Sequence, residues 1–261
     1  MGKAQRERSA RQKLEQVRAR QRAEARRRRL IVGAVAGAAV AVVIAVIAVI
    51  AVSTGGGRSS RQEVMPPGVG GGTPVVQPAA LTVPNTTGIA GVIAYDTTGW
   101  PASSSNGPAN QALGHAHVPG PVQYSVTPPV GGNHNAAWMN CGVYDKPVPA
   151  ERAVHNLEHG AVWITYQPSL PQSEVSQLRA FFGRQTVLSP GGASGSRYVD
   201  LTPYPGLPAP IVVSSWGFQL RLTSPADPRL QEFVTKFRAS QKYTPEYGGA
   251  CTGGLGTPLE S

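Results

Sequence analysis

Residues 134–160 read HNAAWMNCGVYDKPVPAERAVHNLEHG, and this stretch carries the features that decide the fold and the site. Its last part predicts a short helix that Gly160 ends, because glycine is favoured just after a helix C-terminus. His155 and His159 are four residues apart and therefore share one face of that helix. Two imidazoles at this spacing can bind one metal ion, with a nearby carboxylate as a third ligand or a base.

Histidines are confined to one part of the chain, because all five lie between His115 and His159. Neutral imidazole is a good ligand for zinc and copper, so we predict one ion of either metal in this region. Glu158 is the candidate catalytic base if a coordination position stays open to water, and Glu151 is a candidate acceptor that orients the rings. The predicted ligands are His117, His134, His155 and His159.

Two alternatives to this metal site follow from the same residues. The histidines could instead donate to backbone carbonyls and pair with the two glutamates, which would hold loops in place. The segment HNLEH also has the His-x-x-Glu-His form found in one group of zinc peptidases. Gly160 ends the helix at once, and the acidic residues further along show no second-helix pattern, which favours a metal site without peptidase activity.

The two cysteines, Cys141 and Cys251, predict a disulfide if the domain is exported, because an oxidising compartment favours the bond. In the chain-entropy model, closing a loop of roughly 100 residues stabilises the fold by up to about 4.7 kcal/mol. The bond would hold the C-terminal segment beside the histidine stretch. The alternative is that Cys141 is a thiolate ligand of the metal ion.

Positive charge is concentrated at the N-terminus. Residues 1–29 carry twelve Lys or Arg and three Glu, a net charge of +9, whereas the whole chain has +10. The remainder is therefore nearly neutral, which argues against a nucleic-acid surface on the main domain. We predict that residues 1–29 form a basic cytoplasmic tail.

The next segment, residues 30–52, contains no charged or hydrogen-bonding side chain. At about 1.5 Å per residue, a helix of this length crosses a hydrocarbon core of about 30 Å. We predict a transmembrane helix in the plasma membrane, with the arginine-rich flank in the cytoplasm and the rest of the chain outside. A cleaved signal peptide is the alternative, although its apolar core normally has about 7–15 residues.

Composition changes twice after this segment. Residues 53–87 are rich in Gly, Pro, Ser and Thr and predict a linker, because they bury too little surface to offset chain entropy. Aromatic and β-branched residues then recur over 88–261, which predicts one loop-rich domain outside the membrane.

Within that domain, local patterns predict both helices and strands. A strand is expected over 161–166, and two adjacent strands over 210–217 and 218–222. Apolar residues at helical spacing predict helices over 172–182 and 228–238, with Asp227 as the N-cap of the second. Short strands and helices without βαβ periodicity indicate the α+β class.

Several segments carry a resemblance to a known family: HVPGPVQYSVTPPVGGNH (117–134), WMNCGVYDKPVPAERAVHNLEHGAVWITY (138–166), TPYPGLPAPIVVSSWG (202–217) and CTGG (251–254). They resemble the bacterial membrane-anchored envelope family catalogued as the domain of unknown function numbered 3105. The resemblance implies no established activity. It implies that the following residues occupy motif positions: His117, His134, Cys141, Glu151, His155, Glu158, His159 and Cys251.

We therefore expect a single-pass membrane protein whose external domain binds zinc or copper. Its expected partners are the lipid bilayer and another envelope protein, with no nucleic acid. The alternative is a metal-free envelope scaffold or interaction protein.

Overall fold

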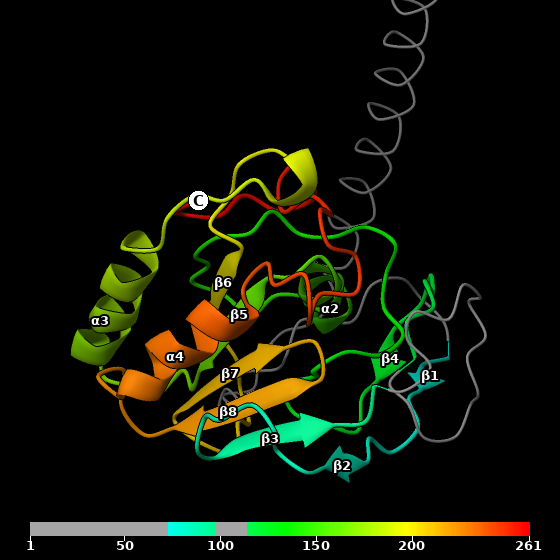
Figure 1. Ribbon diagram of the computed structural model, residues 1–261, viewed down its shortest axis with the longest axis horizontal. Coiled ribbons are helices and arrows are strands. Elements are labelled where there is room, and N and C mark those ends of the chain that lie inside the picture. The colour runs from blue at the N-terminus through cyan, green and yellow to red at the C-terminus, as the bar shows by residue number, and fades with distance from the viewer. Residues whose placement is uncertain (1–72, 98–113) are drawn as a thin grey trace, which may run out of the picture. The chain divides into compact units, whose positions relative to one another are not determined.

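The computed structural model of the protein describes residues 73–97 and 114–261 (Figure 1). In this part of the chain the main sheet has six strands in the order β2-β3-β8-β7-β5-β6. Within it, β5 and β6 run parallel and the other neighbours run antiparallel. The strands are β2 (Thr82–Val83), β3 (Val92–Tyr95), β5 (Val162–Tyr166), β6 (Val199–Pro203), β7 (Ile211–Ser215) and β8 (Phe218–Leu222).

The sheet separates two apolar layers, because successive residues of a strand point to opposite faces. Ile164 and Val213 pack on one face with the helices α3 (Gln172–Gly183) and α4 (Pro228–Phe237). Trp163 and Val212 pack on the other face with the helix α2 (Ala150–Glu158). The described part of the chain is thus a mixed α+β structure, as the sequence predicts, and the structure places helices on both sides of the sheet.

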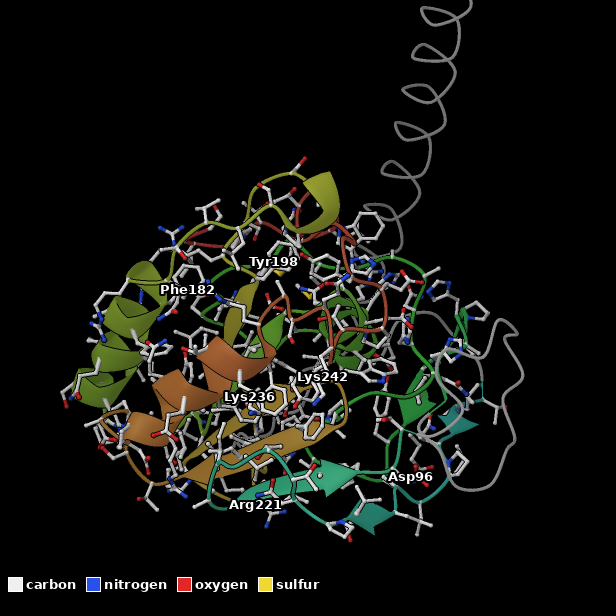
Figure 2. The ribbon with its side chains drawn as sticks, viewed as in Figure 1. Asp96, Phe182, Tyr198, Arg221, Lys236 and Lys242 are labelled. Atoms are coloured by element: carbon white, nitrogen blue, oxygen red, sulfur yellow. A yellow bond between two sulfur atoms is a disulfide. The ribbon has the colours of Figure 1, made fainter. Side chains whose placement is uncertain are left out.

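Side-chain burial follows these layers (Figure 2). Phe182 of α3 and Tyr198, which directly precedes β6, are both buried, and Figure 2 shows them in the interior. Arg221 of β8 is exposed at the opposite side of the sheet. Val154 and Leu157 of α2 pack in the apolar layer on the other face of the sheet, which leaves the opposite face of this helix to carry polar groups.

One connection differs from the sequence expectation. The helix α3 joins β5 to the neighbouring parallel strand β6, so the fold contains a βαβ unit. The local sequence did not indicate it, because β6 follows a Gly/Ser-rich loop and includes the acidic residue Asp200. Asp200 is fully enclosed and accepts hydrogen bonds from the Gly142 backbone N–H at 3.2 Å and the Asn156 amide at 2.7 Å.

The helix ends agree with the sequence signals. Gly160 has φ +97°, a left-handed conformation that glycine adopts without strain and that ends α2. Asp227 caps α4, since its carboxylate accepts the backbone N–H of Arg229 at 2.9 Å. The strand after α2 and the β7–β8 hairpin also form where the residue pattern predicts them.

Two β-strands lie before residue 88, where the sequence predicts that the folded domain starts. The strand β1 (Val75–Val76) pairs with β4 (Val122–Gln123), and β2 pairs with β3. Both β1 and β2 belong to the segment 53–87 whose composition predicts a linker. Their backbone groups gain hydrogen-bond partners from strands distant in sequence, which composition cannot reveal.

The predicted tail 1–29 and the predicted transmembrane helix 30–52 lie outside the described residues. Within residues 73–97 and 114–261, no helix has the length and apolar character needed to cross a membrane.

A disulfide joins Cys141 to Cys251, with their Cα atoms 5.3 Å apart. Both cysteines are buried. The predicted pairing is therefore confirmed, and the alternative in which Cys141 is a thiolate ligand is wrong, because its sulfur is already bonded.

Candidate metal centre

The helix α2 supplies one side of the site. His155 and Glu158 lie on its polar face, and His159 follows at the C-cap position, one turn after His155. All three side chains are buried. Burial of three titratable groups on one short helix costs free energy unless each group has a polar partner. The contacts of these side chains therefore indicate which ligand the site could bind.

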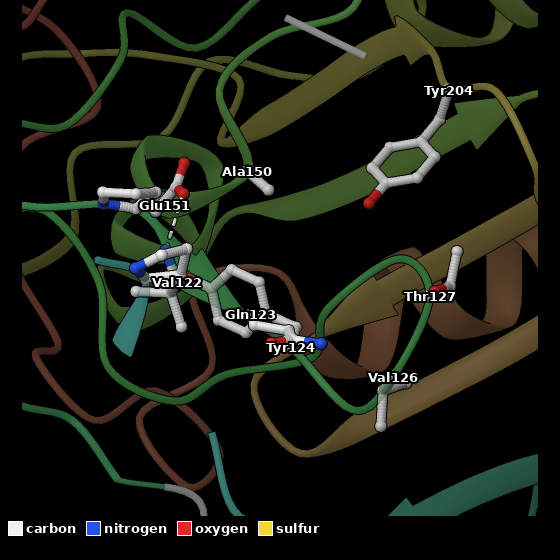
Figure 3. Close-up of a pocket in the computed structure, with 10 residues that line it drawn as sticks. Val122, Gln123, Tyr124, Val126, Thr127, Ala150, Glu151 and Tyr204 are labelled. Carbon is white, nitrogen blue, oxygen red and sulfur yellow. Dashed lines mark hydrogen bonds between the residues drawn. The ribbon is translucent and has the colours of Figure 1, made fainter. Parts of the chain in front are cut away.

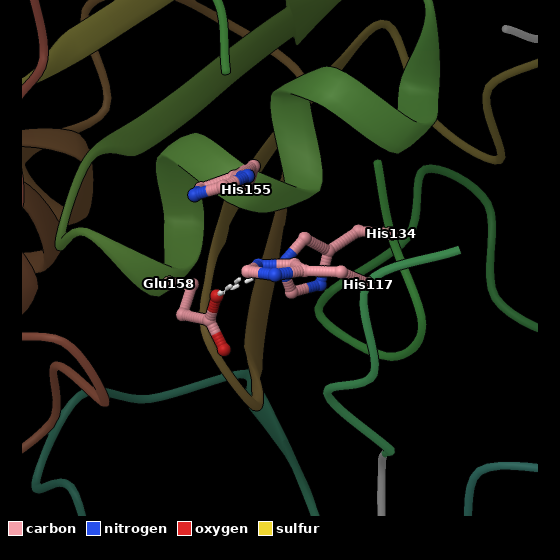
Figure 4. A group of neighbouring side chains, drawn as sticks. All are labelled: His117, His134, His155 and Glu158. Atoms are coloured by element: carbon pink, nitrogen blue, oxygen red, sulfur yellow. Dashed lines mark ion pairs between the residues drawn. The ribbon is translucent and has the colours of Figure 1, made fainter. Parts of the chain in front are cut away.

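Two separate loops supply the opposite side through backbone pairing. His117 and His134 form a parallel bridge in which Val118 N–H donates to the His134 carbonyl at 2.7 Å. His134 N–H in turn donates to the Ala116 carbonyl at 3.0 Å. This pairing places both imidazoles against α2, with ring centroids 4.9 Å apart (Figure 4).

Four donor atoms converge in this region, and each lies within 4.8 Å of the others: one from each of His117, His134, His155 and Glu158. Aromatic rings flank the group, since the Trp216 ring meets the His134 ring edge-on and the Trp138 ring lies against the His155 ring. His134 is fully buried, whereas 46% of the His117 side chain is exposed. Solvent therefore reaches the group from the His117 side.

Backbone carbonyls fix the tautomers of the buried rings. The Nδ1 atom of His134 lies 2.8 Å from the Gly132 carbonyl, that of His155 lies 2.7 Å from the Asn135 carbonyl, and that of His159 lies 2.6 Å from the Ala250 carbonyl. A carbonyl oxygen can only accept, so each Nδ1 carries the proton. In the neutral ring Nε2 then keeps a lone pair, which is the state of a histidine metal ligand whose outer nitrogen is held by the protein.

His134 and Glu158 make the closest contact between the two sides. His134 Nε2 lies 2.8 Å from Glu158 Oε2, yet neither atom has a hydrogen bond of good alignment. With neutral His134, two lone pairs face each other across this gap. Burial alone would raise the pKa of Glu158, but contact with His134 and the nearby imidazoles brings that pKa below its ordinary value. Glu158 is therefore favoured as a carboxylate when a positive charge lies beside it, which a protonated imidazole or a bound cation can supply.

His155 is held neutral. Burial lowers the pKa of His155 to about 4, and the neighbouring His134 and His159 act in the same direction. Its Nε2 lone pair is thus available at neutral pH, and only the deprotonated nitrogen binds a metal ion.

The structure brings together three of the four predicted ligands, His117, His134 and His155. His159 lies in a second group, with His155 and Glu246. Glu158, expected from sequence as a base, stands among the donor atoms of the first group. His115 is nearby, with Nδ1 3.9 Å from Glu158 Oε1.

Glu151 does not orient the histidine rings. Its Oε1 accepts the Val122 backbone N–H at 2.9 Å, and its side chain borders a separate pocket of about 360 Å³ beside Tyr124 and Tyr204 (Figure 3). Backbone carbonyls orient the rings instead.

Sequence reasoning missed Glu246 and Trp138 as members of the site. Glu246 comes from a loop after α4 and has no helical spacing to a histidine, so local pattern carries no signal for it. Trp138 lies inside the quoted stretch, but an aromatic residue there indicates a core position as readily as a site wall.

The fold and site define a mixed α+β domain with a buried His/Glu cluster that could hold a metal ion. The chain belongs to the family described as Protein of unknown function (DUF3105), whose sequence model matches residues 115–253. That range includes both donor groups. No curated protein and no solved structure matches the chain.

Proposed function

We propose that the folded domain binds one zinc or copper ion through His117, His134, His155 and Glu158. The observation that supports this most directly is the orientation of the buried rings. His134 and His155 both donate Nδ1–H to backbone carbonyls, which leaves the Nε2 lone pair of each neutral ring available to a cation, and both residues offer a donor atom within 4.8 Å of Glu158. Donor atoms that converge in a buried space repel each other unless a proton or a metal ion lies between them, and one metal ion can bind all four donors at once.

The donor set suits these metals. Imidazole nitrogen with one carboxylate oxygen is a common ligand combination for Zn²⁺ and is also suitable for Cu²⁺. Cu⁺ prefers soft sulfur ligands, and both cysteines are in the disulfide. A tetrahedral site with bonds of about 2.1 Å separates its donors by about 3.4 Å. The 2.8 Å pair of His134 and Glu158 must therefore open slightly, and donors up to 4.8 Å apart must move closer.

In this proposal Glu158 is a ligand and not the catalytic base expected from sequence. The ion would act as a Lewis acid if a further position admits water. His117 is the ligand next to solvent, so an exchangeable position would open on its side.

Metal retention tests the proposal. The full chain, purified in detergent, stripped with chelator and dialysed against zinc, is expected to keep zinc after gel filtration. His117→Ala removes a half-exposed ligand and should weaken binding at least tenfold while leaving the fold intact. Glu232→Gln, which changes an exposed glutamate on α4 outside both donor groups, is the control and should bind as the wild type does. A folded wild-type chain that retains neither zinc nor copper would refute the proposal and favour the metal-free scaffold.

We also propose that this domain is held outside the plasma membrane by a helix over residues 30–52, with tail 1–29 in the cytoplasm and a linker after it. The arginine cluster before an uncharged apolar segment supports this topology. Protease added to intact spheroplasts should then remove the domain, whereas a cytoplasmic control protein stays intact. A protected domain would contradict the topology.

A further inference from the structure

A second group of donor atoms adjoins the first. His155, His159 and Glu246 each offer an atom within 4.8 Å of the others. His159 Nε2 lies 3.4 Å from Glu246 Oε2, and 48% of the Glu246 side chain is exposed. His155 is the member common to both groups, so the two groups are parts of one continuous cluster.

The two imidazole rings of this second group bring two acceptor atoms close together, as His134 and Glu158 do in the first group. Their Nε2 atoms are 3.0 Å apart, and both Nδ1 atoms donate to backbone carbonyls. In the neutral state two lone pairs therefore point at each other. A cation that binds the first group through His155 Nε2 takes up that lone pair, but the first group contains no atom of His159 or Glu246, so these two donors lie outside its coordination.

The second group is also held in place by its surroundings. The His159 ring packs so closely on Gly249 that a Cβ there would lie 2.4 Å from the ring. Trp138 covers the ring at a centroid distance of 5.4 Å. Glu246 is tied to the helix, since its backbone N–H donates to the Glu158 carbonyl at 2.9 Å. Both ligand-bearing segments are thus oriented before any ion binds.

His155 cannot serve two ions at once. Its Nδ1 is occupied by the Asn135 carbonyl, which leaves one lone pair on Nε2. If that lone pair goes to the second group, each group has two imidazoles and one carboxylate. The first then has His117, His134 and Glu158, and the second has His155, His159 and Glu246. Three protein ligands with open positions are typical of catalytic rather than structural sites.

From this division we infer that the domain holds two divalent transition-metal ions in adjacent sites, an inner one at His134 and an outer one at His159. The inference rests on the proposed metal binding and extends it. Two carboxylates and four imidazoles supply three protein ligands for each of two dications, whereas a single ion would leave two of these donors unused. Solvent reaches the pair at His117 and at Glu246, so water or a small anion would complete the coordination.

Stoichiometry tests the inference. The full chain in detergent, stripped with chelator and titrated with Zn²⁺, is expected to saturate at two ions per chain by elemental analysis. Glu246→Gln should lower the value to one, since it removes a half-exposed outer ligand without disturbing the core. Glu232→Gln, an exposed glutamate on α4, is the matched control and should keep two.

One further variant and two wild-type outcomes distinguish the two-ion inference from the single-ion proposal. His117→Ala should lose the inner ion and keep the outer one, again giving one ion. A wild-type chain that saturates at one ion, unchanged by Glu246→Gln, would overturn the two-ion inference and leave the single-ion proposal standing. A folded wild-type chain that binds no zinc at all would overturn both.

Discussion

The Nδ1 atom of His159 lies 2.6 Å from the carbonyl oxygen of Ala250, the residue next to the disulfide cysteine Cys251. The covalent link to Cys141 thus fixes the carbonyl that orients an outer-site ring. A bond that spans 110 positions in sequence therefore acts directly on the local geometry of the cluster.

Removal of the disulfide should affect the outer ion before the inner one. In the Cys141→Ser/Cys251→Ser double variant, we expect the Ala250 carbonyl to become less well positioned, so that outer-site affinity falls about tenfold or more. The inner ion should remain, because the carbonyl that orients its His134 ring belongs to Gly132, which is distant in sequence from Cys251. Zinc titration of the folded double variant measures the affinity of the outer site and of the inner site. Equal loss of both ions would contradict this link.

The fold itself should also be weakened in that double variant. The loop-closure model predicts a loss of up to about 4.7 kcal/mol for a loop near 100 residues. Unfolding by denaturant with saturating chelator separates this effect from metal binding.

Gly249→Ala should displace the His159 ring. The added methyl group would lie 2.4 Å from the ring, and 3.0 Å from the Glu246 carbonyl, so the imidazole must move. We expect loss of the outer ion with the inner ion retained. Gly183→Ala, at the end of α3 with no atom within 4 Å of the new Cβ, is the control and should bind as the wild type does. Two ions in Gly249→Ala would show that His159 is not an outer ligand.

Asp200 should make stability depend on pH. Burial raises the pKa of Asp200 to about 7 from an ordinary 3.8, although hydrogen bonds from Asn156 and Gly142 favour the charged form. Between these values the folded state binds the proton more tightly than the unfolded state, so stability decreases as pH rises through this window.

Asp200→Asn removes that dependence. The free energy of unfolding of the wild type minus that of the variant should decrease from pH 4 to pH 7 and then stay constant. The variant also sets an amide against the Asn156 amide, but this cost does not vary with pH. Exposed Asp145→Asn is the control and should follow the wild type. A wild-type minus Asp200→Asn difference that is constant across pH would contradict the assignment.

Residues 73–87 should be required for the site. Gln77 is buried in this segment, and its side-chain oxygen accepts the Asn133 backbone N–H at 2.9 Å, directly before His134. Deletion of 73–87 from the full chain should lower both stability and inner-site zinc affinity. Deletion of 53–67, an equal length of linker-like composition, is the control. Equal behaviour of the two deletions would show that β1, β2 and Gln77 are dispensable.

Much of the local structure was predictable because its causes are local. Apolar spacing defines α3 and α4, Gly160 ends α2, and Asp227 caps α4. The pair His155 and His159 follows from helical geometry alone. The cysteine count predicted the disulfide, because a chain with two cysteines permits one internal pairing.

The tertiary structure alone decided which donors meet. His117 reaches His134 through backbone pairing between two loops, and Glu246 reaches His159 through a loop that the disulfide and a hydrogen bond to Glu158 hold on α2. The sequence predicted one set of four histidines, whereas the structure groups His159 with His155 and Glu246 and places Glu158 beside His117, His134 and His155. Spacing along a chain defines the face of a helix, whereas convergence of distant segments depends on packing and hydrogen bonds that no local pattern records.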